Sequence, residues 1–179
     1  MRKTYILILA LAMAMTAFAQ PEGMRPLHVE GNQLVDDGGQ VHVLHGVMDT
    51  PSPYFNNYRW GNACNTSTVA ACREYFTKLF TAITDNSQAA YCNLFRLHLD
   101  PCWTNDPNLP SDGKESGEAD ISRFSETRLT TLMSTLYFPI ARSAIGKGLY
   151  VIMRPPGVCP QNLKAVSYTH LRAHETLRH

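Results

Sequence analysis

NLFRLHL, residues 93–99, is the stretch that decides the fold. Its apolar residues fall at every second position, and Arg96, His98 and then Asp100 stand between and after them. Because successive side chains of a β-strand point to opposite faces, the stretch predicts a strand with one apolar and one polar face. We expect the apolar face to pack on helices and the polar face to turn inward.

Apolar stripes at helical spacing lie on both sides of this strand. The first runs from Val69 to Ile83, and Ser67 or Thr68 is the expected N-cap. The second runs from Leu129 to Ala144, with Ser125 as the expected N-cap. Both stripes predict amphipathic helices that bury one face.

The second helix has a predicted kink and a predicted end. Pro139 removes a helical hydrogen bond and should bend the helix. Gly146 and Gly148 should stop it. The run LYVIM, residues 149–153, is wholly apolar, as is typical of a buried strand in a parallel sheet.

Residues 26–47 begin the order of elements. They hold two clusters of turn residues and predict a small hairpin that leads into a strand at about 41–48. The full order is then hairpin, strand, loop, helix, strand, loop, helix, strand. This alternation predicts right-handed βαβ units and a parallel sheet. Functional residues of such sheets lie at the carboxyl ends of the strands, which here lead into long loops.

Two kinds of parallel fold fit this order. A dinucleotide-binding fold would carry Gly-x-Gly-x-x-Gly after its first strand, but residues 48–57 read MDTPSPYFNN, and no P-loop sequence occurs. We therefore predict the α/β class, as the N-terminal portion of a (β/α)8 TIM barrel. About three βα units would follow the N-terminal β-hairpin.

The composition is that of a globular protein with balanced charge. The 179 residues include 16 Lys and Arg against 15 Asp and Glu, a net charge of +1. This balance gives no reason to expect nucleic acid or an acidic membrane surface as a partner. With 44% apolar and 17% charged residues, the chain is also not of the disordered class.

Residues 1–19 have the pattern of a secretory signal peptide. Arg2 and Lys3 precede an apolar run, and the small residues Ala17 and Ala19 precede the expected cleavage point. We expect cleavage after Ala19, a secreted or periplasmic mature chain, and no membrane association after cleavage. The alternative is a retained membrane anchor.

Export gives the cysteines a particular meaning, because disulfides persist in oxidising compartments. No Cys-x-x-Cys or Cys–His spacing predicts a zinc site. The odd number leaves one thiol free or paired outside the chain, and we interpret Cys72 and Cys92 as buried, small apolar residues. The five cysteines are Cys64, Cys72, Cys92, Cys102 and Cys159.

Three segments in the same order resemble the N-terminal part of glycoside hydrolase family 5, the cellulase-like barrels. They are LHVEGNQLVDDGGQVHVLHGV (27–47), NLFRLHLDPCW (93–103) and GKGLYVIM (146–153). The resemblance covers roughly residues 26 to 164. It implies an eight-stranded barrel that hydrolyses β-linked polysaccharides or oligosaccharides with retention, without a cofactor or a metal.

The resemblance also assigns residues. Arg96 matches an arginine of the second strand that supports the catalytic nucleophile, and His98 on the same face is a second candidate for active-site support. The alternative for Arg96 is pairing with a local carboxylate at the barrel mouth. Two places depart from the family. Met48, followed by Asp49, stands where the family has the asparagine that closes the first strand, and Arg154 begins an Arg-Pro-Pro-Gly sequence where the family often has histidine.

The two catalytic carboxylates that a retaining glycosidase needs are not recognisable here. The sequence contains no Asn-Glu-Pro, and the barrel domain that we assign to residues 20–164 is shorter than the roughly 250 residues of a barrel. We therefore expect a fragment without its catalytic residues, prone to aggregation or partly folded. We interpret the acidic residues of the second loop, Asp100, Asp106, Asp112 and Glu115, as solvated charges.

Two tryptophans follow the first two strands. Trp60 and Trp103 are candidates for substrate binding, because indole faces stack on sugar rings. Tyr54, Phe55 and Tyr58 would extend this platform. The alternative is that these rings fill small cores within the loops. Cys102 stands beside Trp103, and we hypothesise a Cys64–Cys102 disulfide that joins the two loops.

The end of the chain, SYTHLRAHETLRH, offers a different chemistry. His170 and His174 are four residues apart and, with Glu175 or His179, could bind a metal on one helical face. However, the segment lacks an apolar stripe and resembles the translated read-through of a sequencing adapter. We expect a non-native tail at residues 165–179. Two other functions remain as alternatives to the hydrolase: a non-catalytic glycan-binding protein and a metal-binding protein.

Overall fold

The computed structural model describes residues 24–53, 57, 59–61, 63–114 and 116–155. Within these residues no helix is long and apolar enough to cross a bilayer. The chain divides into two compact units, one ending at Val43 and one beginning at Leu44. The predicted signal peptide and tail, Cys159, and the rings of Tyr54, Phe55 and Tyr58 lie outside the described residues.

The first unit is an antiparallel sheet of three short strands in the order β1-β2-β3. The strands are β1 (Leu27–Glu30), β2 (Gln33–Asp36) and β3 (Val41–His42). The turn between β1 and β2 contains Gly31, whose φ of 62° favours glycine. The predicted hairpin is therefore present, with a third strand added.

The predicted strand at about 41–48 is wrong in one respect, because it is two strands. β3 pairs with β2 in antiparallel orientation, whereas β4 (Gly46–Asp49) pairs with β5 (Leu94–His98) in parallel orientation. The chain leaves one sheet and joins another within four residues. A Cβ atom at Gly46 would lie 1.8 Å from the carbonyl oxygen of Leu94, so only glycine fits this entry into the parallel sheet.

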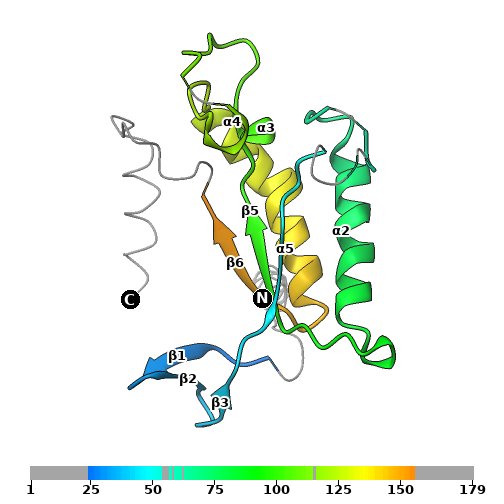
Figure 1. Cartoon of the computed structure of the whole chain (residues 1–179), viewed down its shortest axis with the longest axis vertical. Coiled ribbons are helices and arrows are strands. Elements are labelled where there is room, and N and C mark those ends of the chain that lie inside the picture. The colour runs from blue at the N-terminus through cyan, green and yellow to red at the C-terminus, as the bar shows by residue number, and fades with distance from the viewer. Residues whose placement is uncertain (1–23, 54–56, 58, 62, 115, 156–179) are drawn as a thin grey trace, which may run out of the picture. The chain divides into compact units, whose positions relative to one another are not determined.

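The second unit is built on a parallel sheet of β4, β5 and β6 (Tyr150–Arg154) in that order. Figure 1 shows β5 and β6 side by side, with α2 and α5 next to one another and α3 and α4 near the end of β5. The helices are α2 (Val69–Ile83), α3 (Pro101–Thr104), α4 (Glu126–Leu132) and α5 (Phe138–Ile145), with a π-helix (Met133–Tyr137) and 3-10 turns (Asn86–Gln88, Gly117–Ala119).

The second predicted helix is continuous but irregular. Ser125 caps it as predicted, and its side chain accepts a hydrogen bond from the Arg128 N–H at 3.2 Å. Pro139 lies in the first turn of α5, and the π-helix comes directly before α5. A proline ring clashes with the carbonyl four residues earlier, so the wider π turn relieves the strain that we expected to appear as a kink.

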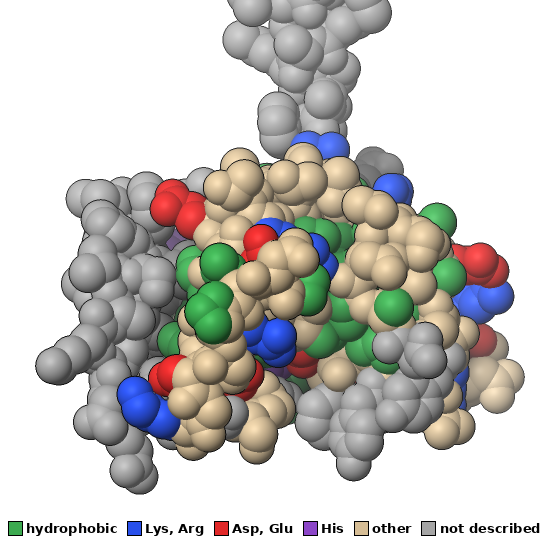
Figure 2. All heavy atoms as spheres, turned by 90° about the horizontal axis from the view of Figure 1, so that it is seen from above, with side chains coloured by type: hydrophobic (Ala, Val, Ile, Leu, Met, Phe, Trp, Pro, Cys, Tyr) green, Lys and Arg blue, Asp and Glu red, His purple; other side chains and the backbone are tan. Residues whose placement is uncertain are grey.

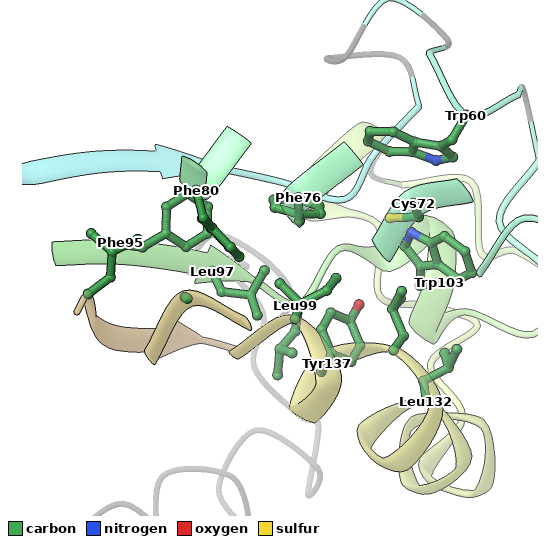
Figure 3. Close-up of a cluster of buried hydrophobic side chains, with 14 of the residues drawn as sticks. Trp60, Cys72, Phe76, Phe80, Phe95, Leu97, Leu99, Trp103, Leu132 and Tyr137 are labelled. Carbon is green, nitrogen blue, oxygen red and sulfur yellow. The ribbon is translucent and has the colours of Figure 1, made fainter. Parts of the chain in front are cut away.

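The apolar face of β5 carries the core. Phe95 and Leu97 are fully buried and Leu99 is 6% exposed, which confirms the predicted alternation. The Phe95 ring meets Phe80 at 4.8 Å and Phe76 at 5.9 Å, both edge-on. Figure 3 shows these rings converging from the helix and the strand.

The opposite face of the sheet is open within the described chain. Arg96 is exposed and lies in register between Met48 of β4 and Ile152 of β6, which are 56% and 49% exposed. The expectation that LYVIM is wholly buried is therefore wrong for Ile152. The physical reason is that the described helices cover one face only, and alternate residues of β6 point away from them.

A pH effect is expected in the first unit, because Asp36 organises its second turn. The carboxylate accepts hydrogen bonds from His42 and from the Gln40 and Gly38 N–H groups, and these lower the Asp36 pKa to about 2. The lowered pKa stabilises the turn above the ordinary pKa of 3.8, and this stabilisation is lost as the pH falls to about 2. We expect His42→Ala to raise the Asp36 pKa towards 3.8 in an NMR titration of the carboxyl carbon. Val41→Ala should leave it near 2; an unchanged pKa in His42→Ala would contradict this account.

The open face should drive self-association, because apolar side chains are exposed on it and the outer edges of β4 and β6 are unpaired among the described residues. We expect the double variant Met48→Glu/Ile152→Glu to increase the monomer fraction in sedimentation velocity. The two substitutions replace exposed apolar side chains by carboxylates, which lie on either side of Arg96 in the sheet. Tyr91→Glu/Leu109→Glu makes the same charge change at exposed positions elsewhere and is the matched control. An equal gain from the control pair would show that net charge, and not this face, governs solubility.

Candidate functional site

Polar side chains gather where the three parallel strands end. His98 closes β5 and is paired in register with Arg154, which closes β6. Thr50 directly follows β4, and Asp100 follows β5 by two residues. Figure 2 looks onto this end of the second unit and shows acidic, basic and hydrophobic side chains close together near the middle of the face. Because neighbouring parallel strands end at one edge, three distant segments supply one site.

The side chains form a network in which His98, Asp100 and Thr50 are buried and Arg154 is half-buried. Arg154 Nη1 lies 2.8 Å from His98 Nε2, and Thr50 Oγ1 donates to Asp100 Oδ2 at 2.6 Å. Arginine can only donate, so Nε2 is the acceptor and the proton of a neutral His98 is on Nδ1. That nitrogen lies 4.0 Å from Asp100 Oδ2. The Arg154 guanidinium, the His98 imidazole and the Asp100 carboxylate therefore lie in a row in space.

Asp100 is held from two sides. Besides the contact with Thr50, its Oδ1 accepts a hydrogen bond from the Cys102 N–H at 2.9 Å and so caps α3. Burial, and next the charge of Asp100, raise the pKa of the Tyr137 hydroxyl. Because Asp100 is only 4% exposed and each of its oxygens accepts a hydrogen bond, the carboxylate is placed to position its neighbours.

The prediction that Asp100 is a solvated loop charge is wrong, since it is only 4% exposed. The N-cap position and the contact with Thr50 explain why a carboxylate is buried here. Of the other predicted loop charges, Asp112 is exposed and pairs with Lys114 at 3.5 Å. Asp106 is half-buried, and Glu115 lies outside the described residues.

The two proposed support residues lie on the same face but differ in environment. His98 is 1% exposed and part of the network, whereas Arg96 is exposed, with its Nη1 3.6 Å from Met48 Sδ. Among the residues that the structure covers, no carboxylate pairs with Arg96. The alternative of a local ion pair is therefore not seen here, and support of a nucleophile stays a prediction.

Trp60 and Trp103 are not a sugar-binding platform in this structure. They are 5% and 0% exposed, so neither ring offers a face to a ligand. Trp103 Nε1 donates to the Pro51 carbonyl at 2.6 Å, and the Trp60 ring packs 4.9 Å from Tyr75. This corrects the prediction that the two indoles bind substrate. The alternative of small cores within the loops is not what the structure shows either, because both rings belong to the hydrophobic core that α2 and β5 also form (Figure 3).

The hypothesised disulfide is present. Cys64 and Cys102 are bonded, with 5.7 Å between their Cα atoms, and join the loops that follow β4 and β5. Cys72 is fully buried and free, and burial raises its thiol pKa, as fits a small apolar residue. Cys92 is free and half-buried.

Sequence reasoning missed much of the network. The sequence patterns do not point to Thr50, and they mark Arg154 only as a departure from the family. The departure at Asp49 also has a structural role, because the carboxylate accepts a hydrogen bond from the Tyr75 hydroxyl at 2.9 Å. The sequence offers one indication that these residues belong to a site: each of them ends a strand or directly follows one.

The site can hold charge and orient groups, but it contains one buried carboxylate where a retaining glycosidase uses two about 5–5.5 Å apart. No cluster of three or more metal-ligating side chains occurs within the described ranges, and the terminal histidines lie outside them.

The Asp100 contacts predict a stability effect. Asp100→Ala removes a helix cap and a buried hydrogen bond to a charged group, which should lower the free energy of unfolding by about 2 to 4 kcal/mol. Asp100→Asn keeps an acceptor and should cost less than half as much. The measurement is urea unfolding followed by tryptophan emission. Asp112→Ala is the control, expected within about 0.5 kcal/mol of the parent; similar losses in both alanine variants would contradict the assigned contacts.

Comparison with known proteins adds no family assignment: no protein-family model and no curated protein matches this chain.

Proposed function

We propose that this chain is the N-terminal part of a secreted glycoside hydrolase that acts on β-linked polysaccharides through a retaining, two-carboxylate mechanism. The observation that carries the proposal is the network of the buried His98 and Asp100 with the half-buried Arg154 at the carboxyl ends of parallel strands. In (β/α)8 enzymes the active site lies at this end of the strands. The resemblance of three segments to the cellulase-like barrels supports the same assignment.

The open face of the sheet fits the proposal. Side chains on the helix-free face of a barrel strand point into the barrel, and Arg96 and His98 share that face of β5. Further strands would pair with the outer edges of β4 and β6 and enclose Met48 and Ile152. The apolar rows that are exposed here would then become interior layers.

Arg96 is then a positioning residue. A guanidinium beside a nucleophilic carboxylate favours its ionised form and lowers its pKa. The exposed Arg96 side chain has no carboxylate partner within the described chain, which leaves it available for one supplied by a later strand. Both catalytic carboxylates would come from later strands, so the 179-residue chain alone should be inactive.

The alternative of a non-catalytic glycan-binding protein depended on Trp60 and Trp103 as a stacking platform. Both indoles are buried, so that alternative loses its main support.

The test is the gene downstream of the codon for Leu163. We expect a continuation with Asn-Glu-Pro and a later glutamate, and a chain extended by it should release reducing sugar from a β-glucan or a β-mannan with retained anomeric configuration. In that enzyme Arg96→Met should reduce kcat and move the acidic limb of the pH profile upward by about one unit, because the nucleophile loses a nearby positive charge. Arg73→Met, at an exposed position on α2, is the control. A continuation without an acid pair, or no release from either glycan, would overturn the proposal.

A further inference from the structure

The disulfide between Cys64 and Cys102 lies at the protein surface. Cys102 is exposed and Cys64 is half-buried. Both residues also line a cavity of about 590 Å³ next to the segments that they join. A thiol that opens a disulfide has to reach one of its two sulfur atoms. The more exposed cysteine, Cys102, is therefore the expected point of attack.

Hydrogen bonds join the same two segments without using the sulfur atoms. Trp103 Nε1 donates to the Pro51 carbonyl at 2.6 Å, and Thr50 Oγ1 donates to Asp100 Oδ2 at 2.6 Å. Both bonds link the chain after β4 with α3 or with its N-cap, which are the pieces of chain that the disulfide also links. Cleavage of the disulfide would therefore leave these two segments in contact.

Arg128 of α4 spans the two segments at the position of the disulfide. Its Nη2 donates to the Cys64 carbonyl at 2.6 Å, and its Nε donates to the Trp103 carbonyl. One acceptor thus belongs to a bonded cysteine and the other to the residue directly after its partner. The guanidinium has a rigid fork of donors, so it holds the two carbonyl oxygens at one spacing. Arg128 is a non-covalent clamp that duplicates the disulfide.

Cys72 is not a competitor for exchange with the pair. Its side chain is fully buried, and burial raises the pKa of its thiol. The thiolate is the reactive form of cysteine, so Cys72 stays protonated and unreactive in the folded chain.

Cys92 is too far from the disulfide to exchange with it. The Thr68 hydroxyl donates to the Ala63 carbonyl at 2.7 Å, which places the neighbouring Cys64 at the N-terminal end of α2. The Cys92 N–H donates to the Ile83 carbonyl at 3.2 Å, at the other end of that helix. A helix of 15 residues is about 20 Å long. The folded chain therefore favours one pairing, Cys64 with Cys102.

We propose that Cys64–Cys102 is a thiol–disulfide exchange site that opens and closes in the folded protein, with a dithiol as the reductant. A thiolate of the dithiol attacks Cys102 Sγ, the bond to Cys64 breaks, and Cys64 leaves as a thiolate that takes a proton from water. The second thiolate of the dithiol then attacks the dithiol's own sulfur in the mixed disulfide and releases Cys102. Two electrons pass to the protein, and the dithiol becomes a cyclic disulfide.

Exchange makes a covalent tether at the strand ends switchable, independently of the proposed function. In the reduced protein, hydrogen bonds alone hold the chain after β4 against α3, so the cavity wall at residues 63–65 gains freedom to move. The Arg128 clamp keeps the two thiols near one another, so an oxidant re-forms the same bond without refolding of the chain.

The first experiment measures where attack takes place. The full chain is treated with dithiothreitol at several urea concentrations below its unfolding transition, blocked with N-ethylmaleimide and mapped by peptide mass spectrometry. We expect Cys64 and Cys102 to be reduced at a rate that urea does not change, with the near-ultraviolet circular dichroism retained. A bond that is reached only through unfolding would be reduced faster with each increment of urea, and this result would overturn the inference.

The second experiment measures the clamp in mixtures of reduced and oxidised dithiothreitol. The equilibrium constant for closing the disulfide should fall about tenfold or more in Arg128→Met, because two hydrogen bonds from a charged group are lost. Arg128→Lys keeps a charged donor and should show a smaller fall, and it carries the comparison if Arg128→Met does not fold. Arg73→Met, at an exposed position on α2, should match the parent chain.

Three further results would contradict the exchange site. They are loss of the near-ultraviolet signal on reduction, an unchanged equilibrium constant in the folded Arg128 variants, and re-oxidation that pairs either cysteine with Cys92.

Discussion

The contact of Phe95 with Phe76 and Phe80 sets the orientation of the central strand, and the second unit depends on it. The three rings are buried, and they lock β5 against α2 with its odd-numbered side chains towards the helices. A shift of one residue would bury Arg96 and His98 among aromatic rings without partners, at a cost of several kcal/mol. The aromatic packing therefore selects the polar face as well as the apolar one.

From this constraint the polar network follows. With β5 oriented, parallel pairing in register brings His98 next to Arg154, and the chain after β5 turns into α3 with Asp100 as its cap. Each polar group is then satisfied by a group from another strand or from the following helix. The disulfide ties the loop after β4 to α3, so the ends of β4 and β5 are held together by a covalent bond and by hydrogen bonds.

The features that the sequence predicts well are local and periodic. Strand alternation at residues 93–99, the helical stripes and the Ser125 cap depend on spacing that each segment carries by itself, and all are present. What was missed depends on tertiary neighbours. The burial of Asp100 needs Thr50 from fifty residues earlier, and the enclosure of Trp103 needs the Pro51 carbonyl. The exposure of Ile152 follows because the described helices lie on one face of the sheet only. Periodicity cannot reveal these neighbours. Whether a given side chain is buried or exposed depends on which residues from distant parts of the chain pack against it.

Sequential parallel strands with crossover helices on one face are common to barrels and to one half of a doubly wound sheet. We propose that the face bearing Arg96 and His98 is the interior of a closed barrel. A crystal structure of the chain extended by its natural continuation tests this most directly. We predict a new strand paired with the outer edge of β6, closure onto β4, and Arg96 enclosed among strand side chains. Helices packed across the face that carries Met48, Arg96 and Ile152 would contradict the claim.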